Sequence, residues 1–185
     1  MKTQASFRFR WRSGLGVAVA LFLVWGLLNA SLAIFVPLSL HSRGADAVDG
    51  LVMSGEMDGA LLGRSLTDIA QTDPRLNSYL VTFMDTMCAQ MMSSALLLLS
   101  VTWFALRRGQ GWALCVAVLA SIAPFVYFVP VIAEFGRMGV SMEGATYLVL
   151  VPASVIIGVA AVGGFGLRAA RAPRTDLPAS TGPSV

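Results

Sequence analysis

The feature of the sequence that most constrains the fold is an unbroken run that starts at Asp73. Asp73-Pro74 is typical of a helix start, because an Asp side chain accepts from free N–H groups of the first turn and Pro at the first helical position lacks an N–H that would have no partner there. No Gly or Pro follows until Gly109. At about 1.5 Å per residue, a helix over 74–106 is roughly 50 Å long, which exceeds the ~30 Å hydrocarbon core of a bilayer. We therefore expect a transmembrane helix of which about a third projects beyond the membrane.

Three further apolar runs, over 15–40, 111–133 and 144–167, are long enough to cross a membrane. Of the 185 residues, 56% are hydrophobic and 12% are charged, whereas soluble domains carry about 25% charged residues. The predicted fold is an all-α, four-helix transmembrane bundle. Pro124 and Pro130 predict kinks in its third helix.

The first apolar run follows a basic segment, 1–14, that carries Lys2, Arg8, Arg10 and Arg12. This order also occurs in signal peptides, whose apolar part is about 7–15 residues long. The run here is longer than that, so we expect an uncleaved helix. At the other end of the chain, residues 168–185 are rich in Pro, Ser, Thr and Gly and are expected to form a disordered tail.

One sizeable polar loop, 41–73, separates the first two predicted spans. Ser65 followed by Asp68 resembles a helix-capping pair. Apolar residues recur at helical spacing through this part of the loop, at Leu61, Leu62, Leu66 and Ile69. The pattern predicts a short amphipathic helix lying on the membrane surface or on the bundle.

Basic residues predict the orientation. The N-terminal segment, the Arg107-Arg108 turn and the 168–174 segment are basic, whereas the other two connections are acidic or mixed. By the positive-inside rule, both chain ends lie in the cytoplasm and loop 41–73 forms an extracytoplasmic cap. Tryptophans are enriched at membrane interfaces, and three of the four lie at the predicted inner boundary: Trp11, Trp103 and Trp112.

Asp85 is the first candidate for a functional residue, because an ionisable side chain within a span is a site hypothesis by default. It lies about 27 Å from Trp103 along the helix, near the outer edge of the hydrocarbon. Ser78, Thr82 and Ser93 share its helical face. A small polar site open to the outside is one interpretation, and a residue that only fixes packing is the other.

Three residues of the other predicted helices reach a similar level and are candidate ligands together with Asp85: Asn29, Glu134 and Tyr147. Arg75 and Arg137 are the candidate counter-charges. We also expect Asn29 to supply an interhelical hydrogen bond.

A second pattern on the same helix consists of sulfur-containing residues at helical spacing, on the face roughly opposite Asp85: Met84, Met87, Cys88 and Met91. Soft sulfur ligands at this spacing suit Cu(I). Methionine is equally a packing residue of apolar helix faces, so both interpretations are open. Small-residue pairs that allow close helix approach occur at Gly26-x-x-x-Ala30, Ser154-x-x-x-Gly158 and Ala160-x-x-x-Gly164.

Two stretches, 72–76 (TDPRL) and 103–113 (WFALRRGQGWA), flank the second apolar span. In this order they resemble small four-span bacterial integral membrane proteins of the actinobacterial type, a family of unassigned function. The resemblance covers roughly residues 60–135 and implies an architecture but no chemistry.

The sequence offers no constellation typical of an enzyme. Cys88 and Cys115 form no C-x-x-C pair, and a single histidine, His41, does not provide the paired axial ligands of a haem-b carrier. We predict an integral protein of the cytoplasmic membrane with a structural or accessory role, no cofactor and no nucleic-acid partner. Its partners would be lipid and another membrane protein that binds the cap. The alternative is a small-solute or cation binding or transport protein that uses Asp85.

Overall fold

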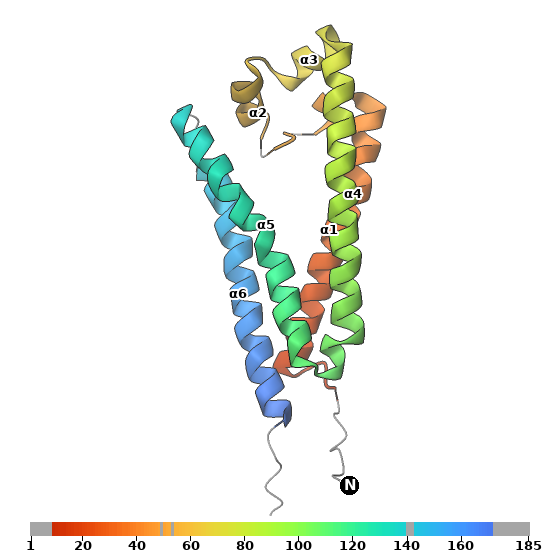
Figure 1. Ribbon diagram of the computed structural model, residues 1–185, viewed down its shortest axis with the longest axis vertical. Helices are drawn as coiled ribbons and strands as arrows, with labels where there is room; N and C mark the ends of the chain where they lie inside the picture. Colours follow the sequence, from red (N-terminus) through yellow and green to blue (C-terminus); the bar gives the residue numbers. More distant parts are fainter. Residues whose placement is uncertain (1–8, 49, 53, 140–142, 172–185) are drawn as a thin grey trace, which may run out of the picture.

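The computed structural model describes residues 9–48, 50–52, 54–139 and 143–171, and these ranges contain helices and connecting turns without a β-strand. Four helices are long: α1 (Gly14–Arg43), α4 (Pro74–Phe104), α5 (Gly111–Arg137) and α6 (Glu143–Arg171). Four are short: η1 (Ala45–Ala47), α2 (Gly55–Leu62), α3 (Leu66–Thr72) and η2 (Leu106–Arg108). The long helices alternate in direction, so α1 begins and α6 ends at the same end of the bundle, here called the terminal end (Figure 1). Helices α2 and α3 lie at the opposite end, here called the loop end.

All four long helices contain a segment long and apolar enough to cross a membrane, and α4 is the least apolar of them. Large hydrophobic side chains cover their outward surfaces, for example Leu97 at 68% and Leu119 at 68% exposure. The predicted all-α fold with four apolar helices is confirmed, and it supports a multi-pass membrane protein.

The ends of these helices follow local sequence signals. Ser13 caps α1 by accepting from the Gly16 N–H, and Asp73 caps α4 by accepting from the Leu76 N–H, with Pro74 in the first turn as predicted. Helix α4 gives way to η2 after Phe104, and the turn closes at Gly109, whose φ of 76° is in the left-handed region that favours glycine.

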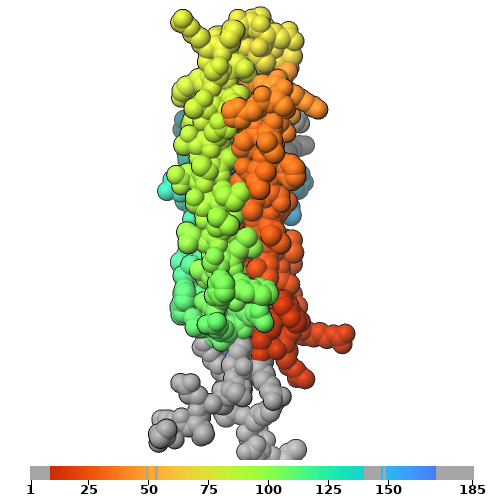
Figure 2. Space-filling view, turned by 90° about the vertical axis from the view of Figure 1, so that its right-hand side faces the viewer, coloured from red at the N-terminus to blue at the C-terminus, as the bar shows by residue number. Residues whose placement is uncertain are grey.

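Helices α1 and α4 lie side by side over most of their length (Figure 2). The buried residues of α4 recur at intervals of seven, seven, three and four: Val81, Cys88, Ala95, Leu98 and Thr102. Gly26 of α1 faces this seam, because a Cβ added there would lie 2.8 Å from the Leu99 side chain. The missing side chain lets the two helices approach closely.

The main hydrophobic core lies toward the terminal end, where all four helices meet. It is built from two groups of buried residues: Leu15, Ala18, Val19, Phe22 and Leu98, and Ala105, Leu106, Ala113, Leu114, Ala117, Val159 and Leu167. Toward the loop end, the α5–α6 pair leans away from the α1–α4 pair (Figure 1). Between Ser121 and the end of α5 at Arg137, only Phe135 is buried, as expected for a helix that leans away from its neighbours.

Several boundaries differ from the sequence predictions. Helix α1 continues to Arg43, and two short helices, α2 and α3, take the place of the single amphipathic helix expected in loop 41–73. Helix α6 continues to Arg171, four residues into the predicted tail, whose remainder lies outside the described residues. Helix α5 stays one helix through Pro124 and Pro130. The helices thus end at turn and cap residues such as Gly44 and Gly63, and these ends do not coincide with the ends of the apolar runs.

The glycines of α6 that make the closest contacts are not those of the predicted small-residue pairs. Nothing lies within 4 Å of a Cβ added at Gly158 or Gly164. Gly163 instead packs against Ala18 and Leu114, and Gly166 against the backbone of Gly14 and Leu15. The α1–α6 contact therefore depends on a face of α6 next to the one that the spacing indicated.

Gly166→Ala should destabilise the protein, because the added Cβ would lie 2.8 Å from the Gly14 carbonyl carbon and would force α1 and α6 apart. Overpacking of this kind costs roughly 1–3 kcal/mol, and we expect a lower midpoint in thermal unfolding of the detergent-purified protein. Gly164→Ala is the matched control, because the same methyl group meets open space there. Equal midpoints for the two variants would contradict the α1–α6 packing.

Candidate functional site

A side-chain contact joins two of the long helices, α1 and α4, near the loop end. His41 lies in the last turn of α1 and Asp85 in the fourth turn of α4, and Nε2 of His41 is 2.9 Å from Oδ2 of Asp85. The two side chains are 61% and 37% exposed. The contact is an ion pair only when the imidazole is protonated and is otherwise a hydrogen bond.

The predicted counter-charges of Asp85 are wrong. Arg137 binds Glu134 of its own helix, with 2.7 Å between Nη1 and Oε2, and the partner of Asp85 is His41 instead of Arg75. His41 follows the first apolar run directly, so counting residues back from the helix end could have placed it at the level of Asp85. The pairing needed the additional knowledge that α1 and α4 are neighbours.

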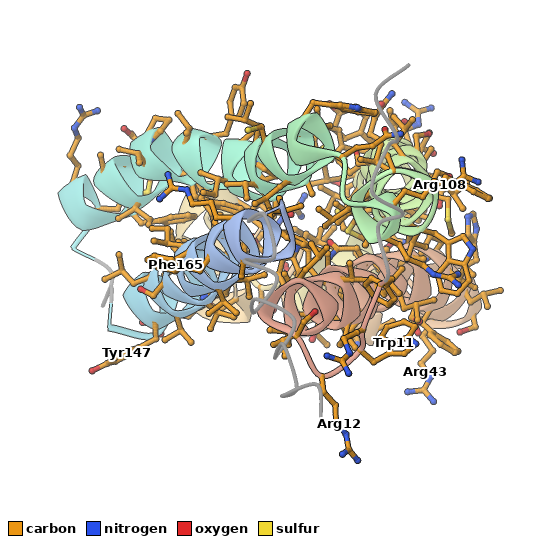
Figure 3. The ribbon with its side chains drawn as sticks, turned by 90° about the horizontal axis from the view of Figure 1, so that it is seen from below. Trp11, Arg12, Arg43, Arg108, Tyr147 and Phe165 are labelled. Atoms are coloured by element: carbon orange, nitrogen blue, oxygen red, sulfur yellow. The ribbon has the colours of Figure 1, made fainter. Side chains whose placement is uncertain are left out.

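The other three candidate ligands do not join Asp85. The Asn29 side chain donates to the Trp25 carbonyl of its own helix at 2.8 Å and makes no interhelical hydrogen bond with any residue that the structure describes. Tyr147 is 69% exposed and projects from α6 on the side away from α4 (Figure 3). Glu134 lies in the part of α5 that leans away from α4 (Figure 1). The partner of Asp85 in the structure, His41, was therefore not among the sequence-derived candidates.

The sulfur-containing residues of α4 divide between two faces. Cys88 is buried in the seam toward α1 with Met84 and Met91 half-buried beside it, whereas Met87 is 52% exposed on another face. Burial within the bundle accounts for Cys88, and Met84 and Met91 flank it on the same side of α4. Among the described residues, no three His, Cys, Asp or Glu side chains are close enough to hold a metal ion.

A second set of polar contacts holds the segment between α1 and α4, residues 44–73, against the helix ends. The Ala45 N–H donates to Oδ1 of Asn77 at 2.8 Å, and Nη2 of Arg64 lies 2.7 Å from Oδ2 of Asp73. Within the segment, the buried Asp58 carboxylate accepts from the N–H groups of Leu51 and Val52. These contacts satisfy buried backbone groups and make residues 44–73 an ordered part of the fold.

The segment forms an open hollow of about 390 Å³ on its surface. Polar and apolar residues of η1, α2 and α3 line it: Asp46, Ala47, Val48, Gly55, Ser65, Leu66 and Thr67. Sequence reasoning missed this feature, because the hollow depends on how three short elements fold back on one another and none of them has a distinctive motif.

Comparisons with protein families, with curated proteins and with solved structures gave no match to this chain. The resemblance to small four-span bacterial membrane proteins stays a hypothesis.

The Asp73 carboxylate should make stability depend on pH. Its pKa lies below the ordinary value of 3.8, because the Leu76 N–H and then the Arg64 guanidinium favour the charged form. The stabilisation is present above about pH 4, the ordinary Asp range, and is lost as the pH falls through the lowered folded-state pKa. Asp73→Asn keeps a capping oxygen but cannot titrate, so its unfolding midpoint should fall less than that of the wild type between pH 5 and pH 2 (about the range that brackets such a shift).

The control for this experiment is Asp68→Asn, which changes an exposed carboxylate that forms no ion pair with any described residue. A pH profile of Asp73→Asn that matches the wild type would contradict the role assigned to Arg64 and the α4 cap.

Proposed function

We propose that the protein is a structural or accessory component of the cytoplasmic membrane, without enzymatic activity, and that residues 44–73 form an extracytoplasmic cap that binds another membrane protein. The observation that carries the proposal is the anchoring of this segment by Asn77 and by the Arg64–Asp73 ion pair. In this proposal the contacts hold an ordered polar surface beside the membrane. The main core of the long helices contains no residue of this segment, so the segment is not needed to pack them. A surface ordered in this way is suited to binding a partner with little loss of conformational entropy.

The proposed orientation places the terminal end in the cytoplasm. Trp11 and Arg12 directly precede α1 and Arg108 lies in η2, so all three are at that end. Arg107 stacks on Trp103, with 4.4 Å between the guanidinium carbon and the ring centroid. Basic and aromatic residues at one end, and acidic residues at the other, support a cytoplasmic terminal end under the positive-inside rule.

The proposal that the protein has no enzymatic activity is based on the contacts that four of its carboxylates make. Asp58 and Asp73 accept from backbone N–H groups, Asp85 contacts His41, and Glu134 contacts Arg137. Each makes a structural contact, and no described nucleophile faces any of them at hydrogen-bond distance. Lipid covers the apolar helix sides in this proposal, and a nucleic-acid partner is not proposed.

Thr67 is the position for the test, because it is exposed and lines the hollow of the proposed cap. A photo-crosslinking amino acid at Thr67 should give a discrete adduct with another membrane protein in intact cells. Thr67→Cys, in a variant with Cys88→Ala and Cys115→Ala, should react with a membrane-impermeant thiol reagent. Gln110, exposed at the terminal end, is the matched position for both measurements and should give neither result.

Two outcomes would contradict the proposal. Labelling of Gln110→Cys but not of Thr67→Cys would reverse the orientation. The second outcome is thiol labelling at Thr67 together with no photo-crosslinked adduct at Thr67 or at Asp46, which also lines the hollow. This result would agree with the proposed orientation but reject the cap as a binding surface.

The second candidate function is binding or transport of a proton or small cation at Asp85. The observation that favours it is the exposed His41–Asp85 contact, which combines a titratable base and a carboxylate at 2.9 Å. An ionisable side chain such as Asp85 within a long apolar helix is a feature that marks ion pathways in membranes.

The cation hypothesis predicts a ligand-dependent shift of the thermal unfolding midpoint. We would measure that midpoint between about pH 4 and pH 9, a range that spans imidazole protonation, with alkali, alkaline-earth and first-row transition-metal ions. A shift present in the wild type and absent from Asp85→Asn would support cation binding. Midpoints of the two proteins that run parallel under every ion would reject it.

A further inference from the structure

Helix α4 carries a second seam on the face opposite the one that packs on α1. Tyr79, Thr86, Ser93 and Ser100 recur every seven residues, and Thr82, Ala89 and Leu96 follow the first three of them by three residues. All seven side chains are exposed, with Tyr79 at 65% and Leu96 at 55%. This is the spacing of positions a and d in a left-handed helix pair. Most of the residues are small, which allows close approach of a second helix in a membrane.

Three hydroxyl groups of this seam, those of Thr82, Thr86 and Ser93, are satisfied by their own helix. Thr82 donates to the Ser78 carbonyl, Thr86 to Thr82, and Ser93 to Ala89, at 2.9, 3.2 and 3.0 Å. They therefore present small surfaces that need no hydrogen-bond partner from another chain.

Gln90 differs, because its side-chain amide makes no hydrogen bond within the part of the chain that the structure describes, and the side chain is exposed. It lies about 20 Å from Trp103 along α4, inside a hydrocarbon core of roughly 30 Å. Lipid offers no partner there, and an unsatisfied polar group in hydrocarbon costs several kcal/mol. A protein group must therefore supply the missing hydrogen bonds.

Asp85 has an unused acceptor that could receive this hydrogen bond. His41 contacts Oδ2 of Asp85, which leaves Oδ1 for another donor. In the heptad defined by the seam, Asp85 occupies position g and Gln90 occupies position e of the next heptad. In a parallel helix pair, g of one chain meets e of the next heptad of the other.

We propose that the protein forms a homodimer in the membrane through this face of α4, with the Gln90 amide of each chain donating to Oδ1 of Asp85 of the other. Two copies in one membrane have the same orientation, so their α4 helices are parallel and both residues lie at matching depths. Donor and acceptor occur on the same stripe, so a two-fold axis makes the hydrogen bond twice. A different protein would need an acceptor and a donor of its own at the same two levels. The proposal is independent of the partner proposed for the cap.

The first test is cysteine cross-linking of the full-length chain in phosphatidylcholine–phosphatidylglycerol vesicles, in a variant with Cys88→Ala and Cys115→Ala. Ser93→Cys should form a disulfide-linked dimer on mild oxidation, and the dimer should persist when lipid is in large excess. Leu119→Cys, exposed on α5 at a similar depth, should not, and neither should Gly158→Cys on the open small-residue face of α6.

The second test measures dimerisation in the same vesicles by energy transfer between labelled chains. Gln90→Leu should weaken the dimer roughly tenfold, since it removes both copies of an interhelical hydrogen bond. Met87→Leu, exposed at nearly the same depth but outside the seam, should leave dimerisation unchanged. Asp85→Leu combined with Gln90→Leu should be no weaker than either single variant, because both remove the same interaction. Gln90→Ala replaces Gln90→Leu if the latter does not accumulate.

Several results would overturn the proposal. A monomer at every protein-to-lipid ratio, cross-linking of Gly158→Cys in place of Ser93→Cys, or additive losses for Asp85 and Gln90 would each reject it. So would a Ser93→Cys adduct with a different membrane protein and none with a second copy.

Discussion

Helix α1 packs against α4 along a seam that begins near Val81 and ends near Thr102, and Gly26 sets how closely the two helices approach. Because they are antiparallel, the last turn of α1 lies beside the early turns of α4. This geometry places His41 at hydrogen-bond distance from Asp85. It also requires the connecting residues 44–73 to fold across the loop end, where Asn77 and Asp73 anchor them. The ion pair and the proposed cap are both consequences of this packing.

The α5–α6 pair joins α1 and α4 differently, through the terminal half of the bundle. Gly163 and Gly166 permit backbone contact with α1 there, and the core extends over all four helices. Toward the loop end, side chains of α5 such as Tyr127 at 77% and Val129 at 64% are exposed. In a membrane these surfaces would meet lipid, which as a solvent for apolar side chains resembles the interior of the bundle. Divergence of the two helix pairs is therefore less costly in a bilayer than it would be in water.

Helix α4 stands apart from the other three because it carries polar residues on its exposed face. Polar residues in a span are expensive and are expected to have protein partners. Thr82, Thr86 and Ser93 find theirs in the preceding turn, and Cys88 is buried in the α1–α4 seam. Gln90 and one oxygen of Asp85 have no such partner among the described residues, and their positions on the two flanks of one heptad seam are the basis of the proposed dimer.

Signals that act over a few residues were sufficient for much of the fold. The four apolar runs, the Asp73-Pro74 helix start and the Ser65 cap predicted helices at those positions, because capping, chain direction and burial in a membrane depend on neighbouring residues alone. Heptad and i, i+4 spacing also identified which residues share a face of α4. The sequence could not assign each face to a neighbour. Only the tertiary structure decided that Asp85 meets His41, that Glu134 pairs within its own helix, and that Gly163 and Gly166 carry the contact expected of other glycines. Spacing defines the faces of a helix, but which neighbour covers each face depends on contacts between residues far apart in the chain.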